Sequence, residues 1–159
     1  MARRVFISFH YSRDISRVNI VRNHGVTKGG YTEAGFWDHS LWEETKRRGD
    51  EAIKRLINQG LQGTSVTVVL IGRYTAGRKW VDYEIEKSGE KGNGFLGVWI
   101  NRLGNLDGYT DDRGRNPLDG WDLGPKKLSS IYPTYDWVLD EGYENFGDWV
   151  EEAAVIAGR

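Results

Sequence analysis

Residues 65–71 (SVTVVLI) decide the fold that the sequence predicts. The run is β-branched and almost continuously apolar, which is the pattern of a strand covered by helices on both faces of a parallel sheet. Apolar residues recur at helical spacing across residues 50–60 just before it, with Asp50 as the expected N-cap and Gly60 as the expected C-terminal stop. The sequence therefore predicts a helix that leads into a central strand.

The same alternation of helices and strands extends in both directions. Apolar runs predict further strands at residues 5–9, 95–101 and 134–138, and a short strand is expected around residues 35–37. Helical spacing predicts helices at residues 14–24, where Ser12 or Asp14 is the expected cap, at 78–91 and at 145–157. Alternating strands and helices predict an α/β fold with a parallel sheet, in which ligands bind beyond the carboxyl ends of the strands.

The long segment at residues 102–130 interrupts this pattern. It is rich in Gly, Asp and Asn and shows little periodicity, so we expect an insertion after the fourth strand. The 159 residues otherwise match the size of one ordinary domain, and a single domain spanning residues 1–159 is the working assumption.

The composition excludes several classes of protein. Charged residues make up 28% of the chain at a net charge of −1, which argues against disorder and against binding of nucleic acid driven by overall positive charge, and leaves a local basic patch open. The absence of cysteine excludes disulfides and thiolate metal sites, and three scattered histidines do not have metal-ligand spacing, so no metal is expected. No apolar run approaches the roughly 20 residues that span a bilayer, and no signal peptide is recognisable, so we expect a cytoplasmic protein without a membrane partner.

Two glycine-rich stretches resemble nucleotide-binding motifs. Residues 92–97 (GNGFLG) spell G-x-G-x-x-G, but they follow a helix and open a strand, so a helix C-cap is the expected role. Residues 72–79 (GRYTAGRK) lie between a strand and a helix, where a phosphate-binding loop belongs. They lack the Lys and Ser/Thr order of a Walker motif, and only weak attraction of an anion by Arg78 and Lys79 is expected there.

The predicted helix at residues 78–91 carries the most informative carboxylate. Trp80 and Glu84 are four residues apart and share one face, whereas Glu86 lies about 200° further round and points to solvent. A carboxylate beside an indole ring is partly desolvated, which raises its pKa and strengthens its field on a developing positive charge.

Several stretches resemble one known family. Residues 5–11 (VFISFHY) resemble the first box of TIR-like domains, and residues 80–84 (WVDYE) resemble the W-x-x-x-E stretch in which NAD-cleaving TIR domains carry their catalytic glutamate. Further stretches resemble the ThsB proteins of the bacterial Thoeris antiphage branch, namely RNH (22–24), FWDHSLWE (36–43), KRLIN (54–58), TSVT (64–67), VLIG (69–72), EKGN (90–93) and YDWV (135–138).

This resemblance implies a flavodoxin-like, three-layer TIR-like fold with about five parallel strands. It implies an enzyme that breaks the nicotinamide–ribose bond of NAD and makes a signal derived from ADP-ribose, such as a cyclic ADP-ribose isomer, which activates an effector protein. A phage-derived trigger and self-association are implied as well, and NAD is a substrate, so no cofactor is expected. Glu84 takes the catalytic position; the expected substrate-binding residues are Ser8, Phe9, His10, Tyr11, Asp38, Ser40, Trp42 and Trp80.

Two other functions remain open from the sequence. A non-catalytic TIR-like scaffold would use the same fold for protein association and would not need Glu84. A flavodoxin-like module that binds a nucleotide or phosphate would instead depend on residues 72–79, so loss of Arg78 and Lys79 would harm it most.

Overall fold

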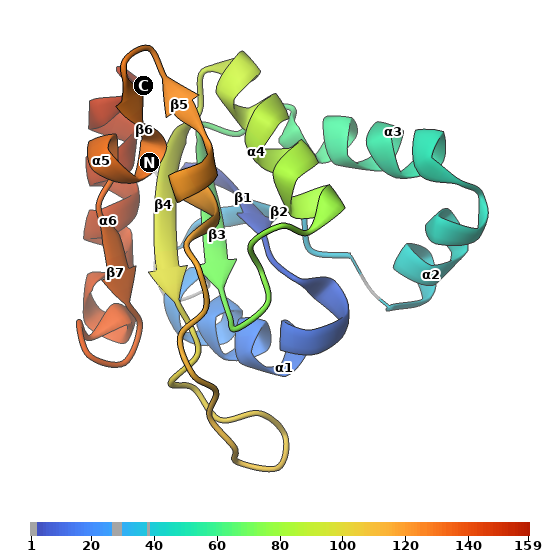
Figure 1. Cartoon of the computed structure of the whole chain (residues 1–159), viewed down its shortest axis with the longest axis horizontal. Coiled ribbons are helices and arrows are strands. Elements are labelled where there is room, and N and C mark those ends of the chain that lie inside the picture. The colour runs from blue at the N-terminus through green and yellow to red at the C-terminus, as the bar shows by residue number, and fades with distance from the viewer. Residues whose placement is uncertain (1–2, 27–29, 38) are drawn as a thin grey trace.

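The computed structural model describes residues 3–26, 30–37 and 39–159, and it shows a central sheet of five strands (Figure 1). The strands are β1 (Arg4–Ser8), β2 (Thr32–Ala34), β3 (Val66–Ile71), β4 (Gly94–Trp99) and β7 (Thr134–Asp136). They lie in the order β2-β1-β3-β4-β7, and every neighbouring pair is parallel. The predicted parallel sheet is confirmed, and its strand order is the flavodoxin-like one.

Helices cover both faces of this sheet. They are α1 (Tyr11–Val21), the π-helical turn η1 (Arg22–Val26), α3 (Asp50–Leu61), α4 (Lys79–Lys91) and α6 (Gly142–Ile156), while α2 (His39–Arg47) packs on α3 away from the strands (Figure 1). Helix α4 packs against β1 on one face, and α6 packs against β3 and β4 on the other (Figure 1). The three-layer arrangement is therefore confirmed. No helix among the described residues is long and apolar enough to cross a membrane.

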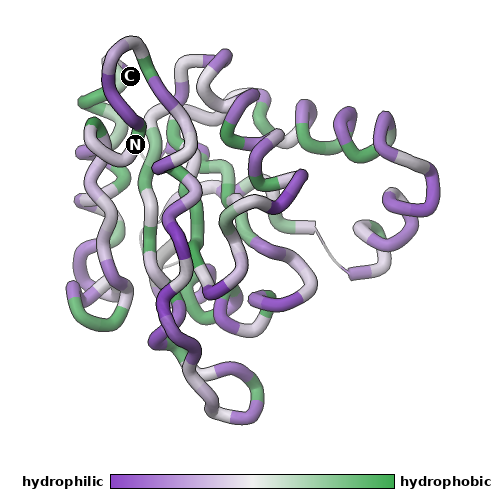
Figure 2. Tube along the Cα trace, in the orientation of Figure 1, coloured by the Kyte–Doolittle hydropathy of each residue, from purple (hydrophilic) through white to green (hydrophobic). Residues whose placement is uncertain are grey.

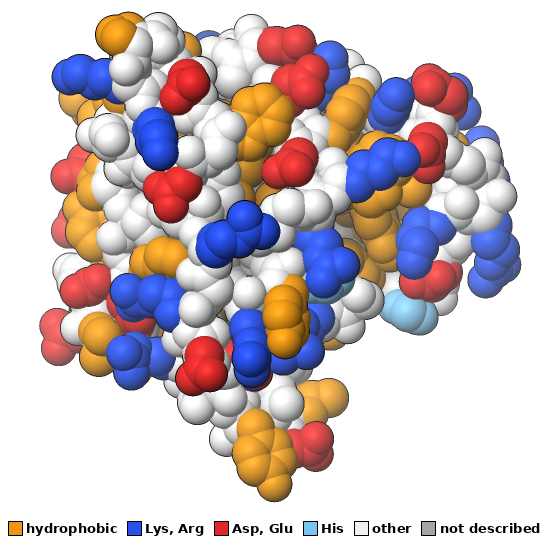
Figure 3. All heavy atoms as spheres, viewed as in Figure 1, with side chains coloured by type: hydrophobic (Ala, Val, Ile, Leu, Met, Phe, Trp, Pro, Cys, Tyr) orange, Lys and Arg blue, Asp and Glu red, His pale blue; other side chains and the backbone are white. Residues whose placement is uncertain are grey.

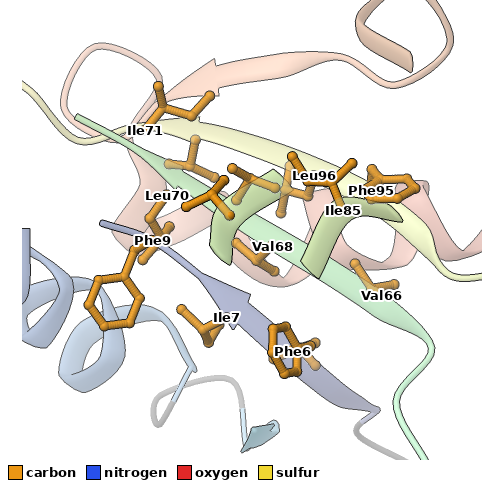
Figure 4. Packing of buried hydrophobic residues seen from close by; sticks show 14 of the residues in the cluster. Phe6, Ile7, Phe9, Val66, Val68, Leu70, Ile71, Ile85, Phe95 and Leu96 are labelled. Atoms are coloured by element: carbon orange, nitrogen blue, oxygen red, sulfur yellow. The ribbon is translucent and has the colours of Figure 1, made fainter. Parts of the chain in front are cut away.

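The core lies between the sheet and these helices. All six residues of β3 are buried, as its almost continuously apolar run predicts. Ile85 of α4 lies over Val68 and Leu96 of the two central strands (Figure 4). Hydrophobic residues concentrate along these strands, while the segment that joins β4 to β7 is mainly hydrophilic (Figure 2). Burial of each large apolar side chain contributes about 1.5–3 kcal/mol, so this layer supplies most of the stability.

The segment between β4 and β7 matches the expected insertion and is tied to the domain at several points. It contains the 3₁₀ turn η2 (Pro117–Gly120), the short strands β5 (Asp122–Leu123) and β6 (Lys126–Lys127), and α5 (Leu128–Ile131). The buried guanidinium of Arg17 donates hydrogen bonds to the carbonyl oxygens of Leu103 at 2.8 Å and Tyr109 at 2.9 Å. The loop that begins the insertion is therefore held against α1.

The glycine motif at residues 92–97 has the predicted structural role. Gly92 is the C-cap of α4 and adopts a left-handed backbone with φ 86°, and β4 begins two residues later. A left-handed residue at a helix end is most often glycine, because glycine has no Cβ to clash.

Several local predictions are wrong. The second strand is β2 at Thr32–Ala34 and not residues 35–37, and α2 was not predicted. Asp50 is the first residue of α3 rather than its cap, and that helix runs one residue past Gly60. Helix α1 begins at Tyr11, so neither of its expected caps lies in the capping position.

Candidate active site

A cavity of about 270 Å³ opens at the carboxyl end of β1. At this strand the chain order reverses, because β2 lies on one side of β1 and β3 on the other. Open α/β sheets bind ligands at such reversal points. The walls come from the end of β1, the start of α1, the stretch after β2, one face of α2 and the first two turns of α4. Figure 3 shows hydrophobic side chains in the hollow between α4 and α2, with Lys and Arg side chains near its edge.

Glu84 is the carboxylate of this cavity. Its side chain points inward because it shares the face of α4 that carries Val81 and Ile85, both buried. Only 4% of Glu84 is exposed, and its Oε1 accepts a hydrogen bond of 2.8 Å from Oγ of Ser8. Burial raises the pKa of Glu84 to about 8, although the Ser8 hydrogen bond acts in the opposite direction. The predicted difference from Glu86 is confirmed, since Glu86 is exposed.

Stacked aromatic rings form the opposite wall. Tyr11 stacks on Trp42 with ring centroids 5.2 Å apart, and Trp42 stacks on Trp37 at 5.7 Å with the rings nearly parallel. Phe9 stacks on the other side of Tyr11 at 5.4 Å. The hydroxyl of Tyr11 donates a hydrogen bond to the carbonyl oxygen of Trp37, which ties α1 to the stretch after β2. Because Trp42 has a ring on each face, this wall gives the cavity a rigid apolar side that limits the access of water.

Basic side chains and one histidine complete the cavity. Lys46, Arg78 and Lys79 line it and are exposed at its edge, where they can attract an anionic group. His10 also lines it, and its pKa is lowered by burial and by the nearby cations Arg78 and Arg13. At neutral pH the imidazole is therefore uncharged and can both donate and accept a hydrogen bond.

The structure brings most of the predicted site residues together. Ser8 lies behind the carboxylate of Glu84, and the other members that line the cavity are Phe9, His10, Tyr11, Trp42 and Trp80. Ser40 is exposed in the first turn of α2 and is not among the lining residues, whereas Asp38 lies outside the described residues.

The sequence did not indicate several of the residues that line the cavity, and Trp37 and Lys46 are the most informative of them. Trp37 and Lys46 both line the cavity, and Lys46 lies one turn after Trp42 on α2. The i, i+4 spacing of Trp42 and Lys46 places both side chains on one face of a helix. This spacing predicts a shared site only once residues 39–47 are known to be helical.

Comparison with known proteins shows the family to which the chain belongs. The family model for the Thoeris protein ThsB, TIR-like domain, matches residues 6–105, which is more than half of the chain. The chain belongs to this ThsB family. The resemblance found in the sequence is thereby confirmed, and the ThsB match contains every residue that lines the cavity of Glu84.

A curated ThsB relative agrees over almost the whole length. It comes from Bacillus cereus (strain MSX-D12) and is 44% identical, covering 94% of this chain and 100% of the relative. Its name is "Putative cyclic ADP-D-ribose synthase ThsB1".

Proposed function

We propose that this ThsB protein cleaves the nicotinamide–ribose bond of NAD and makes a cyclic ADP-ribose type of signal. The observation that carries the proposal is the buried carboxyl group of Glu84, which faces an aromatic cavity at the reversal point of the sheet. The name of the relative from Bacillus cereus supports the class of product.

The chemistry needs little more than one carboxylate. The nicotinamide ring of NAD is a flat cation, and the stacked wall of Tyr11, Trp37 and Trp42 offers the ring a rigid apolar surface. Entry of that cation favours ionisation of Glu84, because opposite charges in a poorly solvated site attract strongly. The bound substrate therefore brings the carboxyl group into its active form.

Bond cleavage then separates neutral nicotinamide from a cationic ribose. The electron pair of the C1′–nitrogen bond stays on nicotinamide, so the leaving group needs no proton, and positive charge develops on the ribose. The Glu84 carboxylate stabilises this oxocarbenium-like state. Attack by an atom of the same molecule gives a cyclic product, whereas attack by water gives ADP-ribose; in both cases the attacking group releases its proton to solvent.

The aromatic walls favour the cyclic outcome. Phe9, Tyr11, Trp37 and Trp42 line the cavity, and apolar surface around a reactive cation limits the access of water. His10 is uncharged at neutral pH, and we assign it the binding of a ribose hydroxyl.

The signal that this protein makes implies further partners. The product would act on a separate effector protein, a phage component would trigger synthesis, and assembly of several copies would accompany activity. NAD serves as the substrate and no additional cofactor takes part.

Mass spectrometry of infected cells tests this function. Extracts of phage-infected cells that express the wild type, Glu84→Gln or Glu86→Gln at equal levels are compared for nucleotides derived from ADP-ribose. Glu86 is the matched control, because it lies on the same helix and faces solvent. We expect a new cyclic product with the wild type and with Glu86→Gln, and none with Glu84→Gln. Absence of any Glu84-dependent product would favour the scaffold function.

A further inference from the structure

A second hollow adjoins the cavity of Glu84. It has a volume of about 640 Å³ and lies between the loop that follows β3 and residues 112–115 of the insertion. Its lining includes four arginines, Arg73, Arg78, Arg113 and Arg115, against the single carboxylate of Asp112. Arg78 also lines the cavity of Glu84, so the two hollows meet at this side chain. We call the second hollow the arginine cavity.

Close backbone packing builds the arginine cavity. A Cβ atom at Gly114 would lie 2.2 Å from the carbonyl oxygen of Arg73, so only glycine lets the insertion approach the loop after β3 this closely. Within that loop, the backbone N–H of Gly72 donates a 2.8 Å hydrogen bond to Oγ1 of the buried Thr75. The arginines therefore extend from two segments that are fixed against each other.

Most of the positive charge in the arginine cavity is not neutralised within the protein. Arg113 pairs with the buried Asp136 at 2.7 Å and stacks over the ring of Trp99. Within the described ranges, no carboxylate forms an ion pair with Arg73, Arg78 or Arg115. Guanidinium groups that share a cavity repel one another, and a bound anion with several oxygen atoms relieves that repulsion. Phosphate oxygens fit the guanidinium fork in pairs of hydrogen bonds.

We propose that the arginine cavity binds the diphosphate of the dinucleotide whose nicotinamide end lies beside Glu84. This inference rests on the proposed function. The cavity of Glu84 is smaller than the roughly 300–1,000 Å³ of pockets that enclose a drug-sized ligand, so it takes one end of NAD and leaves the remainder outside. The diphosphate follows the ribose in NAD, and the shared side chain of Arg78 marks the exit toward the other arginines.

The proposal gives the insertion a role in substrate binding. Arg113 and Arg115 belong to the segment between β4 and β7, beyond the part of the chain that matches the ThsB family model. The loop at residues 72–79 contributes Arg73 and Arg78, so the weak anion site expected there becomes part of the NAD site.

Binding of inorganic pyrophosphate tests the arginine cavity without any catalysis. The double variant Arg73→Ala/Arg115→Ala is compared by calorimetry with the wild type and with Arg48→Ala/Arg55→Ala, which removes the same charge from exposed sites elsewhere. Loss of each charged hydrogen-bond donor typically weakens binding about tenfold, so we expect a loss of about 100-fold in the cavity variant alone. Equal binding by all three proteins, or equal affinity for orthophosphate and pyrophosphate, would overturn the proposal.

A comparison of two substrates separates this inference from the proposed function. With the activated protein, the cavity variant should raise KM for NAD about 100-fold and leave the cleavage of nicotinamide riboside, which has no phosphate, unchanged. If the wild type and the cavity variant cleave NAD with the same KM, the diphosphate site is wrong while the enzyme remains. If the wild type cleaves neither substrate under triggered conditions, the proposed function itself is wrong, and the substrate assignment of the arginine cavity falls with it.

Discussion

Oγ of Ser8 donates a 2.8 Å hydrogen bond to Oε1 of Glu84, and both side chains are buried. Ser8 is the last residue of β1 and Glu84 lies in the second turn of α4, so the bond joins two elements that are 76 residues apart in sequence. It fixes the orientation of the carboxyl group toward the cavity. It also stabilises the ionised form against the cost of burial.

The pH dependence of NAD cleavage should report the ionisation of Glu84. Its pKa is about 8 in the free protein, so most molecules carry the protonated, inactive form at pH 7. We expect kcat/KM of the activated protein to rise with pH and to level off above about pH 8. The inflection in kcat should lie at lower pH, because bound nicotinamide is a cation that favours the ionised carboxylate. A kcat/KM that is flat between pH 6 and 9 would contradict this account of Glu84.

Ser8 should act as a positioning residue for Glu84. Ser8→Ala removes the hydrogen bond that lowers the pKa of Glu84, so the inflection in kcat/KM should move to higher pH. Ser8→Thr keeps a hydroxyl and should restore part of the shift. Ser40→Ala serves as the control, since Ser40 is exposed and lies outside the cavity. An unchanged pH profile of kcat/KM in Ser8→Ala would show that Ser8 does not position Glu84.

Burial of Glu84 should make the protein less stable as the pH rises. Its pKa is about 8 in the folded state and 4.5 in the absence of burial, so between these values the unfolded chain releases its proton first. The free energy of unfolding therefore falls between about pH 4.5 and pH 8, by on the order of 4 kcal/mol from this group.

Replacement of Glu84 by glutamine should abolish this loss of stability at high pH. Glu84→Gln should exceed the wild type in Tm by about 5 °C or more at pH 8 and by little at pH 5. Thermal unfolding followed by circular dichroism at both pH values measures the difference, with the exposed Glu86→Gln as the unchanged control. The same gain at both pH values would show that Glu84 does not titrate as described.

The aromatic wall should contribute mainly to substrate affinity. Trp42 stacks between Tyr11 and Trp37, so Trp42→Ala opens the wall on which the nicotinamide ring would lie. We expect KM for NAD to rise about tenfold, because the variant loses the centre of the apolar wall, and Trp42→Phe to recover most of the affinity. Equal KM values for the wild type and Trp42→Ala would place the ring elsewhere.

The sequence predicts those helices and strands in which buried residues recur at a regular spacing. The run in β3 and the spacing of Trp80 and Glu84 in α4 are strong patterns, because one is buried along its whole length and the other packs one face on the sheet. The second strand is misplaced by three residues because β2 has only three residues and lies at the edge of the sheet. Such a short strand leaves no alternation to read.

Other features of the site depend on contacts that spacing does not encode. Helix α2 buries only Trp42 and Thr45, and the rest of the helix is polar or exposed. The sequence therefore showed no apolar stripe from which to predict this helix or the position of Lys46 in the cavity. The approach of Ser8 to Glu84 and the packing of the insertion on the loop after β3 arise from the tertiary fold. The family resemblance located the carboxylate, but only the structure shows which side chains surround it.

The rate of NAD loss in Glu84→Gln, measured beside Glu86→Gln, tests the central claim most directly. Both variants remove one carboxylate from α4, but only Glu84 faces the cavity. In triggered extracts with equal amounts of folded protein, we predict that Glu84→Gln lowers the rate at least about 100-fold while Glu86→Gln stays near the wild type. A Glu84→Gln rate within about threefold of the wild type would contradict the assignment of Glu84 as the catalytic residue.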